Sequence, residues 1–216
     1  MGQEWLKNNL GMELGERGEE LLAKIQKSYI KSEKVIRAAQ LGEVHRAFRE
    51  NLKYKEDDLE RPEKFKRTAE EIIASGYYHG CSDVGTAIVS VLRRLGVPTI
   101  YVQAGRLDWI EKLNNGDLDA EIYGHIFLEV YLEYGWWLYD PTFNLLYPDY
   151  DPNNLDLPRR YVAYAKSRDG HETGNINLEE NAKKMMIAFQ GYDYMGYRDP
   201  GYVEVNLKEG QSRKVI

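Results

Sequence analysis

Residues 80–98 read GCSDVGTAIVSVLRRLGVP and contain the clearest helical periodicity in the chain. Gly96 and Pro98 mark the end of the predicted helix, because glycine suits the position just past a helix and proline cannot prolong one. The apolar residues recur at intervals of three and four and form one wide stripe, which predicts a largely buried helix. These residues are Val84, Ala87, Ile88, Val91, Leu92 and Leu95.

The only cysteine in the sequence, Cys81, stands at the predicted start of this helix. A neutral thiol is a poor nucleophile, but the free N–H groups and the positive end of a helix dipole stabilise a thiolate. The same N–H groups suit the oxyanion of a tetrahedral acyl intermediate. A cysteine alone is more often a small buried apolar residue. A reactive role for Cys81 therefore needs a base and a carboxylate nearby.

Two downstream segments supply these groups. The sequence GHIFLEV at 124–130 contains His125, and the sequence WWLYDPT at 136–142 contains Asp140. Both segments are rich in aromatic and branched residues, which favours strands. A thiol, an imidazole and a carboxylate thus follow one another along the chain, each on a predicted element.

The two strands are expected to form a hairpin with a tight turn near Gly135. Counted from Gly135, His125 lies ten residues before the turn and Asp140 five residues after it. Because the two are not opposite, we expect a bulge or a longer turn to bring them within hydrogen-bonding distance. Asp140 would then hold the tautomer of His125 that takes a proton from Cys81.

The other elements follow from periodicity and from turn residues. Helices are predicted at 17–40, 41–52, 62–75 and 178–190, the last with Asn177 as its cap. Strands are predicted at 99–104, 122–133, 136–140, 161–165 and 202–207. Irregular chain is predicted at 55–62, at 105–121 after a short helical turn, at 143–158 and in a frayed tail after Leu207. Helices followed by runs of strands favour an α+β fold with an antiparallel sheet.

These residues resemble the transglutaminase-like core. The resemblance rests on Cys81 at the start of its helix, on Gly124-His125 before an apolar strand, and on the ending Asp140-Pro141-Thr142. The segment FRENLKY at 48–54 resembles the one that commonly precedes the cysteine helix of that family. The resemblance covers roughly residues 44–143. Residues 1–40 and 150–216 are not explained by it.

The resemblance implies a papain-like fold, in which the cysteine helix of an N-terminal helical lobe packs on an antiparallel sheet. It implies Cys81 as the nucleophile, His125 as general base and acid, and Asp140 as the orienting residue. The chemistry would be acyl transfer through a thioester, with water or an amine as the acceptor. Phe127 stands where the family often has tryptophan, which alters the packing of the pocket more than the chemistry. The second oxyanion donor is left open, with Tyr54, Tyr78 and Trp137 as candidates.

The composition limits the classes of protein to which this chain can belong. The chain has 216 residues and a formal net charge of −6, with no basic stripe, so nucleic acid is not expected as its main partner. We expect one globular unit, with residues 1–40 as a helical extension and residues 41–216 as the transglutaminase-like domain. A single cysteine and the lack of a signal-like or membrane-spanning run predict a cytoplasmic protein without a membrane partner.

The remaining polar residues suggest no cofactor or metal. His45 and His171 have no ligand spacing with a second histidine or cysteine, so zinc is not expected. The aspartates at 149–156 lack the glycine-containing loop of a calcium site and are read as a solvated loop. His79 would either line the site or, as we expect, face water in a turn. Trp136, Trp137 and the tyrosines of 147–164 would line a groove or pack on the sheet.

Two classes of function remain. The first is a cysteine hydrolase or acyltransferase acting on amide bonds of a peptide or protein substrate, with hydrolysis favoured because water is always available. The second is a catalytically silent domain that binds or scaffolds proteins, in which residues 143–160 block the groove and shield Cys81. A deamidase or an enzyme for glycan amides would share the same three residues. The oligomeric state is left open.

Overall fold

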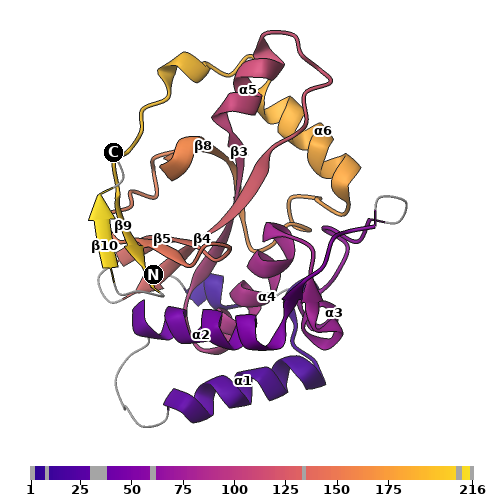
Figure 1. Ribbon diagram of the computed structural model, residues 1–216, viewed down its shortest axis with the longest axis vertical. Coiled ribbons are helices and arrows are strands. Elements are labelled where there is room, and N and C mark those ends of the chain that lie inside the picture. The colour runs from indigo at the N-terminus through magenta and orange to yellow at the C-terminus, as the bar shows by residue number, and fades with distance from the viewer. Residues whose placement is uncertain are drawn as a thin grey trace.

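The computed structural model describes residues 3–7, 10–29, 38–58, 62–132, 135–207 and 211–214. Helices α1 to α4 gather at one end of the molecule and α5 and α6 at the other, with the long strand β3 running between them (Figure 1). The α+β fold expected from the sequence is confirmed, with the cysteine helix packed on an antiparallel sheet. None of the helices in the described residues has both the length and the apolar character needed to span a bilayer.

The central helix α4 spans Cys81–Arg94 and begins at the predicted residue. Leu95 caps it, and Gly96 adopts a left-handed φ of 82° just beyond, as expected from the sequence. Gly85 allows α4 to lie close to the sheet, since an added Cβ would stand 2.7 Å from Ile126 and 3.0 Å from Tyr101. The distance between Cys81 and the strand that holds His125 therefore depends on this glycine.

The other N-terminal helices differ from prediction at their starts. Helix α1 spans Glu16–Tyr29 and α2 spans Ala38–Asn51, so part of the helix predicted at 17–40 belongs to α2. The portion at 30–37 lies outside the described residues. Met12 and apolar residues of α1 and α2 share one core with α4 and the sheet, which joins the N-terminal segment to the rest of the fold.

The helix predicted at 62–75 is shorter than expected, because α3 spans only Ala69–Ser75. Thr68 forms a capping box with Glu71, which provides a strong start signal at this point. Phe65 has a φ of 66°, a conformation that no α-helix contains. Residues 62–67 therefore form a turn, and this turn lies at the site described below.

The main sheet has eight strands in the order β10-β9-β6-β5-β4-β3-β8-β7, and every pair of neighbours is antiparallel. The strands are β3 (Thr99–Arg106), β4 (Gly124–Leu132), β5 (Gly135–Asp140), β6 (Leu145–Tyr147), β7 (Asp156–Leu157), β8 (Tyr161–Ser167), β9 (Val203–Asn206) and β10 (Gln211–Lys214). A separate parallel pair joins β1 (Lys53–Tyr54) to β2 (Tyr77–Tyr78). Short 3-10 helices are η1 (Gln3–Leu6), η2 (Leu10–Met12), η3 (Pro158–Arg160) and η4 (Tyr194–Gly196).

The register of the β4–β5 hairpin shows how His125 and Asp140 lie relative to each other. Leu132 pairs with Gly135 and Leu128 pairs with Tyr139, without a shift between them. One step further in this register, Asp140 faces Phe127. His125 is two residues from Phe127 and points to the same face, because side chains alternate along a strand. The predicted bulge or longer turn is therefore not needed.

Three segments that were predicted to be irregular contain regular secondary structure. Helix α5 spans Leu107–Asn114 within the predicted loop at 105–121. Its own residues Trp109 and Ile110 are buried. Strands β6 and β7 lie within 143–158, and β10 lies in the predicted frayed tail. Single short strands like these gain their stability from neighbours in the sheet, which local sequence does not reveal.

Helix α6 spans Leu178–Phe189 and starts at the predicted cap, where the side chain of Asn177 accepts from the Glu180 N–H. It packs on β3 and β4 at two glycines. A Cβ at Gly105 would lie 2.4 Å from Phe189, and one at Gly124 would lie 3.1 Å from Met185. The two glycines thus bring α6 close to the strand that begins with Gly124 and His125.

Candidate active site

Cys81 is the first residue of α4 and is half-buried. The first backbone hydrogen bond of the helix runs from the Val84 N–H to the Gly80 oxygen, so the N–H groups of residues 81–83 precede the helical ladder. Gly80 provides no side-chain cap. The thiol therefore lies at the positive end of the helix dipole, next to backbone donors that the helix itself does not use.

His125 lies on β4 beside this helix and is buried among aromatic rings. Its ring centroid is 4.8 Å from that of Phe127, 5.2 Å from Tyr161 and 5.9 Å from Phe143. Its Nε2 lies 3.0 Å from Oδ2 of Asp140, and the ring lines the same pocket as Cys81. Because Asp140 accepts from Nε2–H, Nδ1 is the ring nitrogen that remains to serve as a base.

Asp140 ends β5 and is fully buried. Its second oxygen, Oδ1, accepts from the N–H groups of Thr142 at 3.0 Å and Phe143 at 3.2 Å. This turn holds the carboxylate with one oxygen on the backbone and the other on the imidazole. Asp140 and His125 are diagonal neighbours on one face of the hairpin, a separation that side chains of this length can bridge.

The charge balance of the histidine follows from these contacts. Burial by itself would lower the pKa of His125, but the charge and hydrogen bond of Asp140, together with Cys81, raise that pKa to about 10. The imidazole is therefore able to take up a proton and keep it at neutral pH. An imidazole with this property, lining one pocket with a thiol at a helix N-terminus, is the kind of arrangement that activates sulfur nucleophiles.

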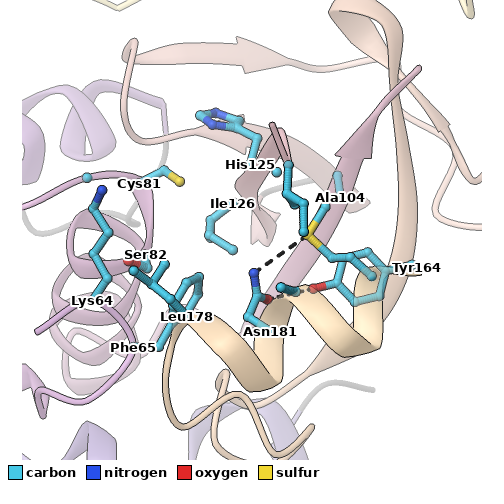
Figure 2. A pocket seen from close by; sticks show the side chains of 15 residues that line it. Lys64, Phe65, Cys81, Ser82, Ala104, His125, Ile126, Tyr164, Leu178 and Asn181 are labelled. Atoms are coloured by element: carbon cyan, nitrogen blue, oxygen red, sulfur yellow. Dashed lines mark hydrogen bonds between the residues drawn. The ribbon is translucent and has the colours of Figure 1, made fainter. Parts of the chain in front are cut away.

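A pocket of about 350 Å³ opens against Cys81 and His125. Figure 2 shows Cys81 and His125 along the top of it, Lys64 beside the cysteine, Phe65 next to Leu178, and Asn181 and Tyr164 across from Cys81. The complete lining is Lys64, Phe65, Gly80, Cys81, Ser82, Ala104, Ile122, Gly124, His125, Ile126, Tyr164, Leu178, Asn181, Ala182 and Met185. None of these residues comes from 143–160, the segment expected to block the groove in a silent domain.

The structure pairs His125 with Asp140 and places Cys81 and His125 in the lining of one pocket, but the three candidate oxyanion donors lie elsewhere. Tyr54 is largely exposed, the Tyr78 hydroxyl accepts from Arg49, and Trp137 packs against the main core. None of the three lines the pocket at Cys81.

The sequence did not indicate the far wall of this pocket. The tyrosines of 147–164 were expected either to line a groove or to pack on the sheet. Tyr164 lines the pocket, whereas Tyr147 and Tyr150 are buried in the core of the sheet. Leu178, Asn181 and Met185 lie on the predicted helix α6. The apolar spacing of that helix was a signal for burial, but it did not show which element would lie opposite.

His79 is buried rather than exposed to water, which corrects the preferred expectation. Its Nδ1 contacts the Lys55 carbonyl at 2.9 Å, and its Nε2 contacts Glu63 at 3.1 Å. The hydrogen bond from His79 is the main cause that lowers the pKa of Glu63. His79 therefore anchors the turn before α3 and does not line the pocket.

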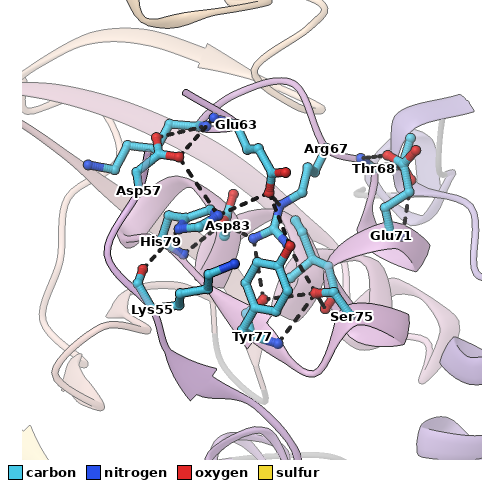
Figure 3. Close-up of polar contacts among 12 residues, drawn as sticks. Lys55, Asp57, Glu63, Arg67, Thr68, Glu71, Ser75, Tyr77, His79 and Asp83 are labelled. Carbon is cyan, nitrogen blue, oxygen red and sulfur yellow. Dashed lines mark hydrogen bonds and ion pairs between the residues drawn. The ribbon is translucent and has the colours of Figure 1, made fainter. Parts of the chain in front are cut away.

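Asp83 completes this cluster (Figure 3). It accepts from the His79 N–H at 2.8 Å and forms a buried ion pair with Arg67. Asp57, in the loop predicted to be solvated, is buried and accepts from the N–H groups of Glu63 and Lys64. The cluster thus ties Asp57 and residues 62–67 to the first turn of α4 and holds Lys64 and Phe65 beside Cys81.

No metal centre is evident in the part of the chain that the structure describes. Its His, Cys, Asp and Glu side chains form no group of three or more placed to hold an ion. His171 contacts the Phe65 carbonyl at 2.9 Å, and His45 is buried within the helical layer. These two histidines therefore lie in separate environments and do not form a pair that could bind a metal ion.

Comparison with known proteins gives two matches. The family model described as the transglutaminase-like superfamily matches residues 24–141. The crystal structure of a "putative cysteine protease" from Cytophaga hutchinsonii is similar to this chain, with a TM-score of 0.50 and 15% sequence identity over 79% of this chain and 48% of that chain. The present chain thus spans about half the length of that protein, and the likeness concerns the fold alone. No curated protein matches the chain significantly.

Proposed function

We propose that this chain, which belongs to the transglutaminase-like superfamily, is a cysteine enzyme that hydrolyses an amide bond of a peptide or protein substrate through a thioester. Cys81 is the nucleophile, His125 the general base and acid, and Asp140 the orienting residue. The observation that carries the proposal is the position of His125, which is hydrogen-bonded to Asp140 and lines one pocket with Cys81. The family match supports the proposal as well, but only at the level of the superfamily.

In the first half of the reaction, the Cys81 sulfur attacks the substrate carbonyl while His125 holds the proton of the thiol. The carbonyl oxygen becomes an oxyanion beside the N–H groups of residues 81–83, which precede the helical ladder. The C–N bond then breaks, and His125 gives its proton to the leaving amine. The products of this half are a thioester on Cys81 and a free amine.

In the second half, water takes the place of the amine. His125 accepts a proton from water as its oxygen attacks the thioester carbonyl, and the proton then returns to the departing sulfur. An amine acceptor would follow the same route and yield a crosslink. We favour water because it is always available and because no feature of the described residues marks a separate amine site.

The alternative is a catalytically silent domain that binds proteins. It requires an unreactive, shielded thiol, and the pocket against Cys81 argues for the enzyme. We also propose that residues 1–40 form a helical extension of one unit with residues 41–216, which the shared core of α1 and α4 supports. A reactive thiol favours a reducing compartment such as the cytoplasm.

The test of the nucleophile is the pH dependence of iodoacetamide labelling, because Cys81 is the only thiol. We expect fast labelling well below pH 8 in the wild type and slow labelling in His125→Ala. Both proteins in urea serve as the control and are expected to label at the rate of a free thiol, whose pKa is about 8.5. Slow labelling of the folded wild type, with the same pH dependence as in urea, would reject the enzyme and favour the binding domain.

The test of the reaction is turnover of a mixture of peptides, followed by mass spectrometry, with a fluorescent primary amine present. Hydrolysis predicts new carboxyl termini without incorporation of the amine, whereas crosslinking predicts incorporation. Cys81→Ala is expected to abolish both products and to keep the circular dichroism spectrum of the fold. Turnover that persists in Cys81→Ala contradicts the assigned nucleophile.

A further inference from the structure

The pocket at Cys81 has two walls of different origin. One wall belongs to the segment matched by the family model and includes Gly80, Ser82, Gly124 and Ile126 beside the reactive pair. The opposite wall lies beyond residue 141 and comes from β8 and α6. Its members are Tyr164, Leu178, Asn181, Ala182 and Met185. The shape of the pocket therefore depends on residues beyond the matched segment as well as on those within it.

The far wall is apolar where it faces the pocket. Asn181 is its one amide, and neighbours engage that amide: Oδ1 accepts from the Tyr164 hydroxyl at 3.1 Å and from Asn175 at 2.8 Å, and Nδ2 faces the Met185 sulfur at 3.6 Å. The remaining members contribute aliphatic, thioether and aromatic surface. A polar substrate group in this space would lose water, and this wall would provide it with no partner beyond the second N–H of the Asn181 amide.

Lys64 is the one lining residue with a formal charge apart from His125. Its side chain lies against Gly80, with Cε 3.7 Å from the position that a Cβ of Gly80 would occupy. The ammonium group thus lies close to the cysteine, at the edge of the pocket (Figure 2). A positively charged substrate side chain entering here would meet a like charge.

The dimensions suit one side chain. A pocket of about 350 Å³ is near the lower end of the range found for small-molecule sites. It has room for a large aliphatic or aromatic side chain together with the adjoining backbone. The close packing of α6 at Gly124 and Gly105 leaves this wall little freedom to withdraw.

We propose that this pocket selects an uncharged apolar side chain, such as leucine, methionine or phenylalanine, on the residue whose carbonyl Cys81 attacks. The proposal rests on the proposed function and specifies its substrate class. Apolar burial against α6 and β8 provides the attraction, and Lys64 disfavours lysine and arginine at the same position. The apolar part of this selectivity is located in residues of β8 and α6 outside the family match, so related enzymes with another C-terminal segment would select differently.

The experiment uses chloromethyl ketones of the form acetyl-Ala-X-CH₂Cl, in which the thiolate displaces chloride and X takes the place of the attacked residue. The second-order rate of modification is measured by mass spectrometry for X as glycine, leucine, phenylalanine, glutamate and lysine. Leucine and phenylalanine are expected to react about 10- to 100-fold faster than glycine, as full burial of such a side chain allows. Lysine is expected to be among the slowest.

Ala182→Phe fills the pocket from α6 and is expected to reduce the ratio of the leucine rate to the glycine rate to near one. Ile187→Phe is the matched control, because Ile187 is on the same helix but largely exposed and does not line the pocket. It is expected to keep the wild-type ratio. Should Ala182→Phe fail to fold, Leu178→Ser tests the same wall at a position that is already partly exposed.

The outcomes separate the two proposals. Fast, His125-dependent labelling by iodoacetamide together with equal rates for all five ketones overturns the pocket assignment and leaves the enzyme in place. Slow, His125-independent labelling overturns the enzyme and, with it, the assignment of the pocket. An unchanged ratio of leucine to glycine in both Ala182→Phe and Leu178→Ser would also overturn the assignment, because neither change to the wall would then affect selection.

Discussion

The imidazole of His125 and the carboxylate of Asp140 meet with Nε2 and Oδ2 3.0 Å apart, although the two residues are not partners in the hairpin. Asp140 faces Phe127 in the register, and His125 lies one pleat further along the same face. The turn after Asp140 fixes the carboxylate through two backbone N–H groups. The orientation of the histidine is therefore built into the register of one hairpin and the turn that follows it.

Asp140→Asn is expected to keep the turn and to impair the histidine. The amide oxygen would stay on the Thr142 and Phe143 N–H groups, so the amide nitrogen would face Nε2 and favour the wrong tautomer. Loss of the negative charge would also lower the pKa of His125. We expect labelling of Cys81 or turnover to fall by about 10²- to 10⁴-fold, with the upper limb of the pH profile at lower pH. Asp108→Asn, which alters the exposed ion pairs of Asp108 with Arg106 and Arg160, should match the wild type.

The free energy of unfolding should depend on pH through His125. Its folded-state pKa of about 10 is above the ordinary histidine pKa of 6.5, so the protonated ring stabilises the folded state. This contribution is fully present below pH 6.5 and is lost as the pH rises through 10. Urea unfolding of the wild type and of His125→Gln at pH 6, 8 and 10 should show an advantage of the wild type that shrinks with pH. An advantage that stays constant across this range would contradict the assigned charge state.

Gly85→Ala should destabilise the protein although alanine is the better helix former. The added Cβ would approach Ile126 and Tyr101 to 2.7 Å and 3.0 Å, so α4 must move away from the sheet. We expect a loss of about 1–3 kcal/mol in the free energy of unfolding and slower labelling of Cys81, since the thiol would move away from His125. Gly42→Ala in α2 is the control, because its Cβ would stand 3.7 Å from the nearest atom. That variant should be neutral or slightly stabilised.

Asp83→Asn should weaken the turn that holds Lys64 and Phe65. It removes the charge that pairs with the buried Arg67 guanidinium. We expect a loss of up to about 3–5 kcal/mol in the free energy of unfolding, measured by urea titration, because the buried arginine keeps only its longer ion pair with Glu63, at 3.7 Å. Glu20→Gln, which breaks the exposed pair with Arg17, should leave stability nearly unchanged. Equal effects of the two substitutions would contradict a structural role for the Asp83 cluster.

Lys64→Glu should relax the selection against positive charge. The ketone with lysine is expected to react several-fold faster with this variant than with the wild type, whereas the ketone with leucine should change little. Lys66→Glu makes the same change of charge at an exposed neighbour that does not line the pocket. If both variants accelerate the lysine ketone equally, the effect is one of overall charge and not of the pocket edge.

The sequence predicted correctly those elements whose boundaries depend on neighbouring residues alone. The apolar stripe and glycine boundary of α4 and the Asn177 cap of α6 each involve residues within one or two helical turns, so their positions could be read directly. The start of α3 was misplaced because Pro62 suggested a helix, whereas the capping box at Thr68 and the left-handed Phe65 set the real boundary. Strands β6, β7 and β10 are too short to have a periodic signal.

The sequence by itself determined the order of thiol, imidazole and carboxylate, the helix that begins at Cys81 and the family of the chain, because these depend on residue type and short-range spacing. Only the tertiary structure decided that His125 and Asp140 meet on the diagonal of a hairpin, that His79 anchors a turn instead of facing water, and that α6 closes the pocket against Cys81. Each of these depends on contacts between segments far apart in the chain. The packing of helices against a sheet determines such contacts, and no local pattern encodes them.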